Sequence, residues 1–343
     1  MNTLKFAMAA LCAGFLFFGC SEKPKLYVYT WADYIDPDLL QKFEKENGCK
    51  VVIDTFDSNE AMYAKLMAGG QGYDVLMPTE YMMRPLVDAG LVSKLDPEKL
   101  PNAVKNVDPK FKTQWTFGYD VPYAFSCIGV LWRKDKVPQG MEFKDWEELF
   151  DPSLGGRVCM MNDVREIVGL GLKMNGYSVN STNDVEIAKA AETARRWKTR
   201  VSKMDNEAYR TGIPAGEFVA AMSYNSDAIM LLADDPDSLG YSVPTNGGPS
   251  SVDVLCVTAN SSSKELAHKF IDMFYDLDNA VKNAEYNGTP MPVVGLYDVL
   301  SDKYKAIPFM RVDEALRARC EDIIDVGPAL EKYSKAWDAI KRQ

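Results

Sequence analysis

The sequence has little of what enzymes use at their active sites. It contains one histidine, His268, and none of the motifs that mark nucleophile-elbow hydrolases, P-loop proteins, dinucleotide-binding folds or zinc proteases. His268 falls within a helical run, residues 266–274, and we interpret it as a solvated surface residue. Asp163 and Glu166 have the residue types of a glycosidase pair, but such a pair needs a set separation that a sequence does not give. We therefore predict a protein that is not an enzyme.

Paired or clustered cysteines are also absent. The seven cysteines include no C-x-x-C pair and no spacing typical of a metal site, so we predict neither a disulfide framework nor a metal or cofactor. Several of them lie in apolar runs, where cysteine packs as a small hydrophobic residue. With 47% hydrophobic and 26% charged residues, the 343-residue chain has globular composition and is long enough for two domains.

The first twenty residues differ from the rest. They contain one lysine, Lys5, and an apolar run over residues 6–18 that ends at Gly19-Cys20. This pattern predicts a signal peptide over residues 1–19, because the run is too short for a membrane span. A small residue directly before Cys20 is typical of a bacterial lipoprotein, with residues 20–24 as the acylated N-terminus and linker. The alternative is plain secretion with Cys20 as a spare thiol.

The sequence has fewer basic than acidic residues. The 39 lysines and arginines face 49 acids, for a net charge of −10, which becomes −11 once Lys5 is removed with the leader. Such a surface repels nucleic acid and anionic lipid and attracts cations at long range. We predict no nucleic-acid partner and favour a cationic ligand.

The chain then alternates strands and helices. Residues 27–29 predict a strand, and Asp36-Pro37 predicts a helix start that runs to a stop at Gly48. Residues 50–56 predict a buried strand, Asp57 with Glu60 resembles a capping box, and residues 73–77 predict a third strand. This order indicates an α/β fold with a parallel sheet, in which the loops at 31–34 and 78–81 face one ligand.

A second α/β unit follows. We predict strands over residues 156–161, 218–224 and 252–258, with helices over residues 163–174, 184–198, 226–233, 264–274 and 330–340. Two such units that present loops to each other form a cleft that can open about a hinge.

Four segments carry a family resemblance: Tyr29–Ile35, Phe56–Glu60, Lys65–Gly70 and Tyr73–Pro78. They resemble the spermidine/putrescine-binding proteins of polyamine ABC importers, and the likeness spans nearly all of the chain after about residue 25. It implies a two-domain type II periplasmic binding protein fold with a ligand cleft and hinge between the domains. Domain 1 would comprise residues 25–129 plus 254–297, and domain 2 residues 130–253 plus 298–343. The partners it implies are a polyamine, a membrane permease and an ATPase.

A polyamine sets clear chemical demands. Each ammonium needs a nearby carboxylate, because an unpaired buried ion costs several kcal/mol. The methylene spacer needs apolar walls, and aromatic rings serve both purposes because they also attract cations.

The resemblance assigns these roles to particular residues. Trp31, Tyr34 and Tyr224 would wall the ligand, with Thr79 and Tyr81 beside them; Asp163 and Glu166 would bind a terminal amine, Asp253 a central one, and Asp227 matches an acid of putrescine binders. The alternative for Asp163 and Glu166 is that they are helix N-terminal acids favoured by the dipole. We interpret Asp33 as solvated or capping.

Three positions depart from the family pattern. Ser251 replaces a tryptophan, Thr289 a tyrosine and Ile323 a glutamine. With Asp227 present and that tryptophan missing, we favour putrescine over spermidine. We predict a monomeric substrate-binding lipoprotein in the periplasm or cell envelope, anchored to a membrane through Cys20. The alternatives are a receptor for another small cationic or neutral solute, such as an amino acid or sugar, and a surface lipoprotein without transport.

Overall fold

The computed structural model describes residues 23–342. The predicted signal peptide and Cys20 lie outside this range. The strands are β1 Lys25–Thr30, β2 Lys50–Thr55, β3 Val75–Leu76, β4 Val121–Arg133, β5 Val158–Met160, β6 Lys203–Met204, β7 Ala220–Tyr224, β8 Leu239–Ser242, β9 Pro249–Val257 and β10 Glu321–Asp322.

The helices alternate with the strands over most of the chain. They are α1 Pro37–Asn47, α2 Asn59–Met67, α3 Met83–Asp88, α4 Pro101–Asn106, α5 Val164–Met174, α6 Asp184–Lys198, α7 Ala208–Ala215, α8 Asn225–Asp234, α9 Lys264–Met273, α10 Leu277–Asn287, α11 Leu296–Val299, α12 Asp302–Lys305, α13 Glu314–Arg319 and α14 Leu330–Lys341. Within residues 23–342, no helix combines the length and the apolar character needed to cross a bilayer.

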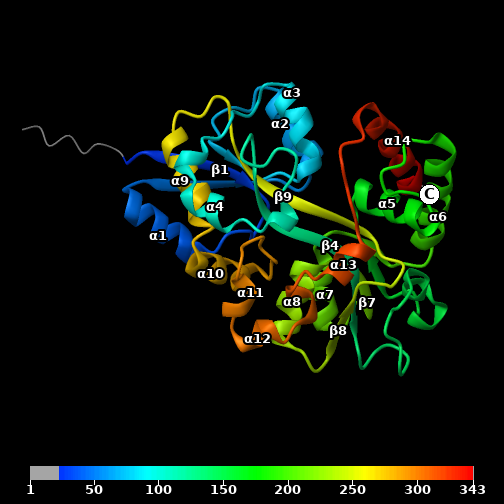
Figure 1. Ribbon diagram of the computed structural model, residues 1–343. Helices are drawn as coiled ribbons and strands as arrows, with labels where there is room; N and C mark the ends of the chain where they lie inside the picture. Colours follow the sequence, from blue (N-terminus) through cyan, green and yellow to red (C-terminus); the bar gives the residue numbers. More distant parts are fainter. Residues whose placement is uncertain (1–22, 343) are drawn as a thin grey trace, which may run out of the picture.

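Two long strands connect the two halves of the molecule. The sheet order is β2-β1-β3-β9-β4-β7-β5-β6, with parallel pairs at both ends and antiparallel pairs where β4 and β9 meet their neighbours. Residues 121–127 of β4 pair with β9, and residues 128–133 pair with β7 and β8. Figure 1 shows β4 and β9 running together from one lobe, with α1, α2 and α9, into the other, with α5, α6 and α7.

The first strand and helix form as the sequence predicts. The side chain of Asp36 accepts a hydrogen bond from the backbone of Asp38, at 2.8 Å, and Pro37 occupies the first helical turn. Gly48 ends α1 with φ of 61°, in the left-handed region where a Cβ would cause strain. These caps fix where β1 stops and therefore place the loop that carries Trp31 and Tyr34.

Three predictions about local structure are wrong. β2 is not buried, because it is the edge strand of the sheet and only Val51 is half-buried. The cap of α2 is Ser58, whose hydroxyl accepts from the Ala61 backbone, so Asp57 and Glu60 form no capping box. His268 is buried: its Nε2 accepts a hydrogen bond from the Asp96 backbone at 3.0 Å, which ties α9 to a neighbouring loop.

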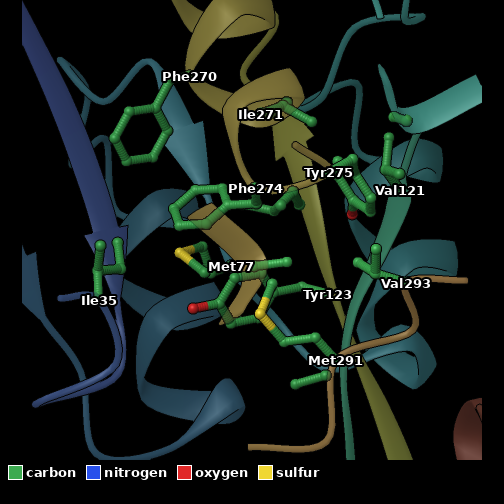
Figure 2. Close-up of a cluster of buried hydrophobic side chains, with 14 of the residues drawn as sticks. Ile35, Met77, Val121, Tyr123, Phe270, Ile271, Phe274, Tyr275, Met291 and Val293 are labelled. Atoms are coloured by element: carbon green, nitrogen blue, oxygen red, sulfur yellow. The ribbon is translucent and has the colours of Figure 1, made fainter. Parts of the chain in front are cut away.

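Three apolar clusters support this scaffold. The first packs α9 and α10 against β1 and β3, and Figure 2 shows Phe274, the residue that follows α9, between Phe270 and Met77. The ring of Phe274 also lies 5.2 Å from that of Tyr123. The third lies between α5, α6 and α14. The second contains residues of both lobes, among them Tyr29 and Tyr209. The two lobes are thus packed together along the line where the predicted site residues lie.

Candidate functional site

A cavity of about 170 Å³ lies where the two lobes meet. Loops after β1 and β3 line it from one side, and the starts of α5, α7 and α8 line it from the other. All of the predicted ligand contacts line this cavity: Trp31, Tyr34, Thr79, Tyr81, Asp163, Glu166, Tyr224, Asp227 and Asp253. Residues that are as much as 222 positions apart in the chain therefore converge on one hollow.

Aromatic rings form the wall on the β1 side. Trp31 packs edge-on against Phe56, with ring centroids 4.4 Å apart, and Tyr34 packs against Tyr123 at 5.0 Å. The indole Nε1 of Trp31 is buried and has no hydrogen-bond partner among residues 23–342. A buried N–H that lacks a partner costs free energy unless a bound molecule supplies an acceptor or an ordered water. The rings of this wall are therefore packed in place, but one buried hydrogen-bond donor among them, Trp31 Nε1, lacks an acceptor.

Asp253 sits in the floor of the cavity and is held by two hydroxyls. Its Oδ2 accepts from the Tyr34 hydroxyl at 2.5 Å, and its Oδ1 accepts from the Thr79 hydroxyl at 2.6 Å. Asn59 holds Thr79 in turn through two hydrogen bonds of 3.0 Å. Asp253 makes no ion pair within the part of the chain that the structure describes, so the carboxylate is oriented but its charge is not matched.

Asp163 and Glu166 differ although both belong to the first turn of α5. Asp163 is the N-cap, and its Oδ1 accepts from the backbone amides of Arg165 and Glu166 at 2.8 and 3.0 Å. Oδ1 of Asp163 therefore acts as a helix cap, as the alternative interpretation of this residue holds. Glu166 is buried, its Oε2 has no hydrogen-bond partner, and no cation of residues 23–342 pairs with it. A charge placed this way is costly.

The acid–base behaviour of these groups follows from their burial. Burial raises the pKa of Glu166 well above its ordinary value, and the neighbouring Asp163 carboxylate raises it further. Burial also raises the pKa of Asp253, against the hydrogen bonds from Thr79 and Tyr34. Clustered buried acids of this kind are destabilised as anions, and a nearby cation relieves the cost.

Arg165, which our sequence analysis missed, forms no ion pair with these acids, although its charge opposes the rise that burial causes in the pKa of Glu166 and Asp163. Its guanidinium donates to the Ile324 carbonyl at 3.0 Å and to Asn180 Oδ1 at 2.8 Å. It also stacks over the Tyr81 and Tyr333 rings, at 5.4 and 4.9 Å. Its position between Asp163 and Glu166 in the sequence was the available signal. Arg165 orients the ring of Tyr81 and braces α5.

Asp227 has different surroundings. Its Oδ2 accepts from the Tyr209 hydroxyl at 2.5 Å, and its Oδ1 lies 3.5 Å from Nε of Arg210, which the sequence analysis also missed. Arg210 lies equally close to Asp33 of the β1 loop, at 3.5 Å. Asp33 is largely exposed and has positive φ, at 53°. The prediction that Asp33 is solvated agrees with this position.

The three departing positions fall at different distances from the site. Ser251 and Ile323 line the cavity, whereas Thr289 lines a neighbouring hollow. Tyr224 ends β7 and presents its ring to the cavity at the start of α8. Across residues 23–342, no group of three histidines, cysteines or acids is arranged to hold a metal ion.

Comparison with known sequences agrees with this geometry. A family model described as bacterial extracellular solute-binding protein matches residues 38–310. The spermidine/putrescine-binding periplasmic protein of Escherichia coli K12 is 30% identical over 98% of this chain and 99% of its own length. The putrescine/cadaverine-binding protein of Pseudomonas aeruginosa is 29% identical over 92% of this chain and 93% of its own.

Solved structures agree as well. A putative spermidine/putrescine ABC transporter protein of Listeria monocytogenes superposes with a TM-score of 0.87 at 30% identity, covering 93% of this chain and 99% of the other. The TpPotD lipoprotein of Treponema pallidum gives 0.83 at 28% identity, covering 93% and 100%. These matches confirm the resemblance and the periplasmic binding protein fold that it implied. The chain belongs to the family of bacterial extracellular solute-binding proteins.

Proposed function

We propose that the protein binds a polyamine, putrescine or spermidine, in this cavity and delivers it to the permease of an ABC importer. The observation that carries the proposal is Glu166, a buried carboxylate with neither a hydrogen bond nor an ion pair at its Oε2. Asp253 provides a second anionic site with no cation of its own. Two separate unmatched carboxylates suit a ligand with an ammonium at each end.

The proposed ligand would relieve the cost of burying the unmatched carboxylates. Each ammonium would pair with a carboxylate, which offsets a desolvation penalty of several kcal/mol per ion. Each buried methylene contributes about 0.8 kcal/mol against the rings of Trp31, Tyr34 and Tyr224. The names of the Escherichia coli and Pseudomonas relatives, which refer to spermidine, putrescine and cadaverine, support the same class of ligand.

Two of the three domain boundaries that we propose fall inside the connecting strands, and the third, between residues 297 and 298, falls inside α11. Residue 129 lies within β4, and residues 253 and 254 lie within β9. Small changes in the twist of these strands would rotate one lobe against the other; the cluster of α5, α6 and α14 would move as a unit, whereas the second cluster, which contains residues of both lobes, would have to repack. Ligand-dependent closure about this hinge would be the signal that the permease recognises.

We propose that the mature protein is a monomer held at the cell envelope through acylated Cys20. The family acts outside the cytoplasm, and the similar Treponema pallidum protein is a lipoprotein. Residues 21–24 would then serve as the short tether between the lipid and β1.

The alternative ligands fit the cavity less well. An amino acid brings a carboxylate that needs a free cation, but Arg165 is held by Asn180 and Ile324, and Arg210 by two acids. A neutral sugar would leave the charges of Glu166 and Asp253 unmatched. A thermal-shift screen separates the three classes, because a ligand at 100 times its Kd stabilises the folded state by about 2.7 kcal/mol. We expect diamines to raise the Tm and amino acids and sugars to leave it unchanged.

Binding should also depend on pH. The acids of the site have raised pKa values, whereas an ammonium keeps its proton up to about pH 10. As the pH falls, protons therefore compete with the ligand, and the affinity should drop by up to about tenfold per unit for each acid that titrates. Calorimetry between pH 8 and 5, in buffers of different ionisation enthalpy, measures both the affinity and the protons released. A constant or rising affinity toward pH 5 would contradict this explanation.

A further inference from the structure

Arg210 stands at the junction of two hollows. The ligand cavity and a larger, more open hollow of about 800 Å³ share part of their lining: Ala32, Tyr34, Glu207, Arg210, Ser226 and Asp227. Asp163, Glu166 and Asp253 line only the inner cavity, and Asp33, Lys203 and Thr289 line only the outer one. The shared residues therefore mark the end of the inner cavity that opens toward the outer hollow, where Tyr34 reaches Asp253 by a hydrogen bond while Asp163 and Glu166 lie off the shared lining.

Two of the charges at this end, those of Arg210 and Asp227, are already matched within the protein. Nε of Arg210 lies 3.5 Å from Oδ1 of Asp227, and Nη2 of Arg210 lies 3.5 Å from Oδ2 of Asp33. The Tyr209 hydroxyl satisfies the second oxygen of Asp227. Asp227 thus differs from Glu166 and Asp253, which have no cation partner. A ligand ammonium at Asp227 would have to displace the guanidinium or lie beside it.

A ligand ammonium that lies beside the Arg210 guanidinium is in an unfavourable position. Two unit charges 4 Å apart repel by about 1 kcal/mol in water and by about 4 kcal/mol at the effective dielectric of a protein surface. The side chain of Arg210 is 37% exposed, so we expect the repulsion to lie between these two energies. Arg210 is the third residue of an eight-residue helix, α7. Because Asp33 belongs to one lobe and Asp227 to the other, Arg210 is held from both sides of the cleft.

We propose that Arg210 is a specificity-determining residue, a built-in cation that ends the ligand slot at Asp227 and makes the site select diamines over triamines. The inference rests on the proposed polyamine function and adds the residue that limits ligand length. In this arrangement Glu166 and Asp253 take the two ammoniums of a diamine. A third ammonium would reach the guanidinium and find no buried carboxylate free, since Glu207, the other acid at this end, is exposed to solvent.

Calorimetric titration of putrescine and spermidine into three variants tests the assignment. Arg210→Gln removes the fixed cation and frees Asp227, so the affinity for spermidine relative to putrescine should rise at least about tenfold. Asp227→Asn leaves the guanidinium less compensated, so this ratio should move in the opposite direction. Lys203→Gln is the control, because it removes a cation that lines only the outer hollow, and its ratio should stay within about threefold of the wild type.

The outcomes separate the two proposals. If the wild-type chain binds polyamines but Arg210→Gln leaves the ratio unchanged, or weakens both ligands equally, Arg210 does not set specificity. If Asp227→Asn weakens putrescine more than spermidine, Asp227 contacts the ligand directly and the assignment is overturned. If the wild type binds neither polyamine, the proposed function itself fails. The melting temperature of each variant without ligand shows whether it is folded.

Discussion

The Glu166→Gln variant is expected to bind putrescine about 100- to 1,000-fold more weakly than the wild type, a loss of ~3 to 4 kcal/mol. The substitution keeps the shape of the side chain and removes its charge. Glu166 has no other cation to bind in the described structure, so its charge would serve only the ligand. Removing it leaves one ammonium of the bound diamine without its counter-ion, and isothermal titration measures the loss.

The same variant should be more stable than the wild type when no ligand is present. The pKa of Glu166 is raised in the folded protein, so at pH values above that pKa the ionised side chain lowers the free energy of unfolding. This cost fades as the pH falls toward the ordinary value near 4.3, where the carboxyl group is neutral in both states. Thermal unfolding at pH 7.5 and pH 4.5 should show a higher Tm for Glu166→Gln only at pH 7.5.

Glu207→Gln is the matched control for this experiment. Glu207 lines the same cavity but is exposed to solvent, where water already stabilises its charge. The substitution should change the affinity for putrescine by less than about threefold. If Glu166→Gln behaved like Glu207→Gln in both measurements, Glu166 would have no role in the site.

Asp253→Asn is expected to weaken putrescine binding by about 100-fold while leaving the fold intact. The amide can keep hydrogen bonds with Tyr34 and Thr79, whose hydroxyls hold the carboxylate at 2.5 and 2.6 Å, but it offers no charge to the second ammonium. Titration calorimetry gives the affinity, and circular dichroism with thermal melting reports the fold.

The control for this substitution is Asp57→Asn, since Asp57 lines the cavity from an exposed loop position. We expect nearly wild-type affinity for the control. Full affinity in Asp253→Asn would remove Asp253 from the site, and a melting temperature many degrees lower would mean that Asp253 acts on the fold instead.

Local signals in the sequence predicted the elements that frame the site. Asp36-Pro37 and Gly48 set the ends of α1, and Asp163 caps α5, because caps depend on neighbouring residues alone. We predicted that β2 is buried and that His268 is solvated, and both predictions are wrong. Burial at these positions depends on which distant segment covers them. β4 was not predicted as one strand, since its almost continuous burial removes the alternation that marks a strand.

The sequence predicted which residues gather at one cavity, and their contact with a ligand stays a prediction. The family resemblance named residues that all line one cavity. No pattern in the sequence shows that Glu166 lacks a partner while Asp227 has Arg210, because those pairings join separate elements in space. Arg210 carries no motif, and only the meeting of α7 with the β1 loop reveals it. In our proposal, the choice among polyamines depends on these pairings.

Titration of the purified wild-type protein with putrescine, spermidine, an amino acid and a sugar tests the central claim most directly. If unmatched buried acids between two lobes hold a dication, putrescine should bind one molecule per chain, with an affinity that falls on acidification, and the last two ligands should give no heat of binding. No binding of either polyamine at millimolar concentration, or tight binding of the sugar, would contradict the claim.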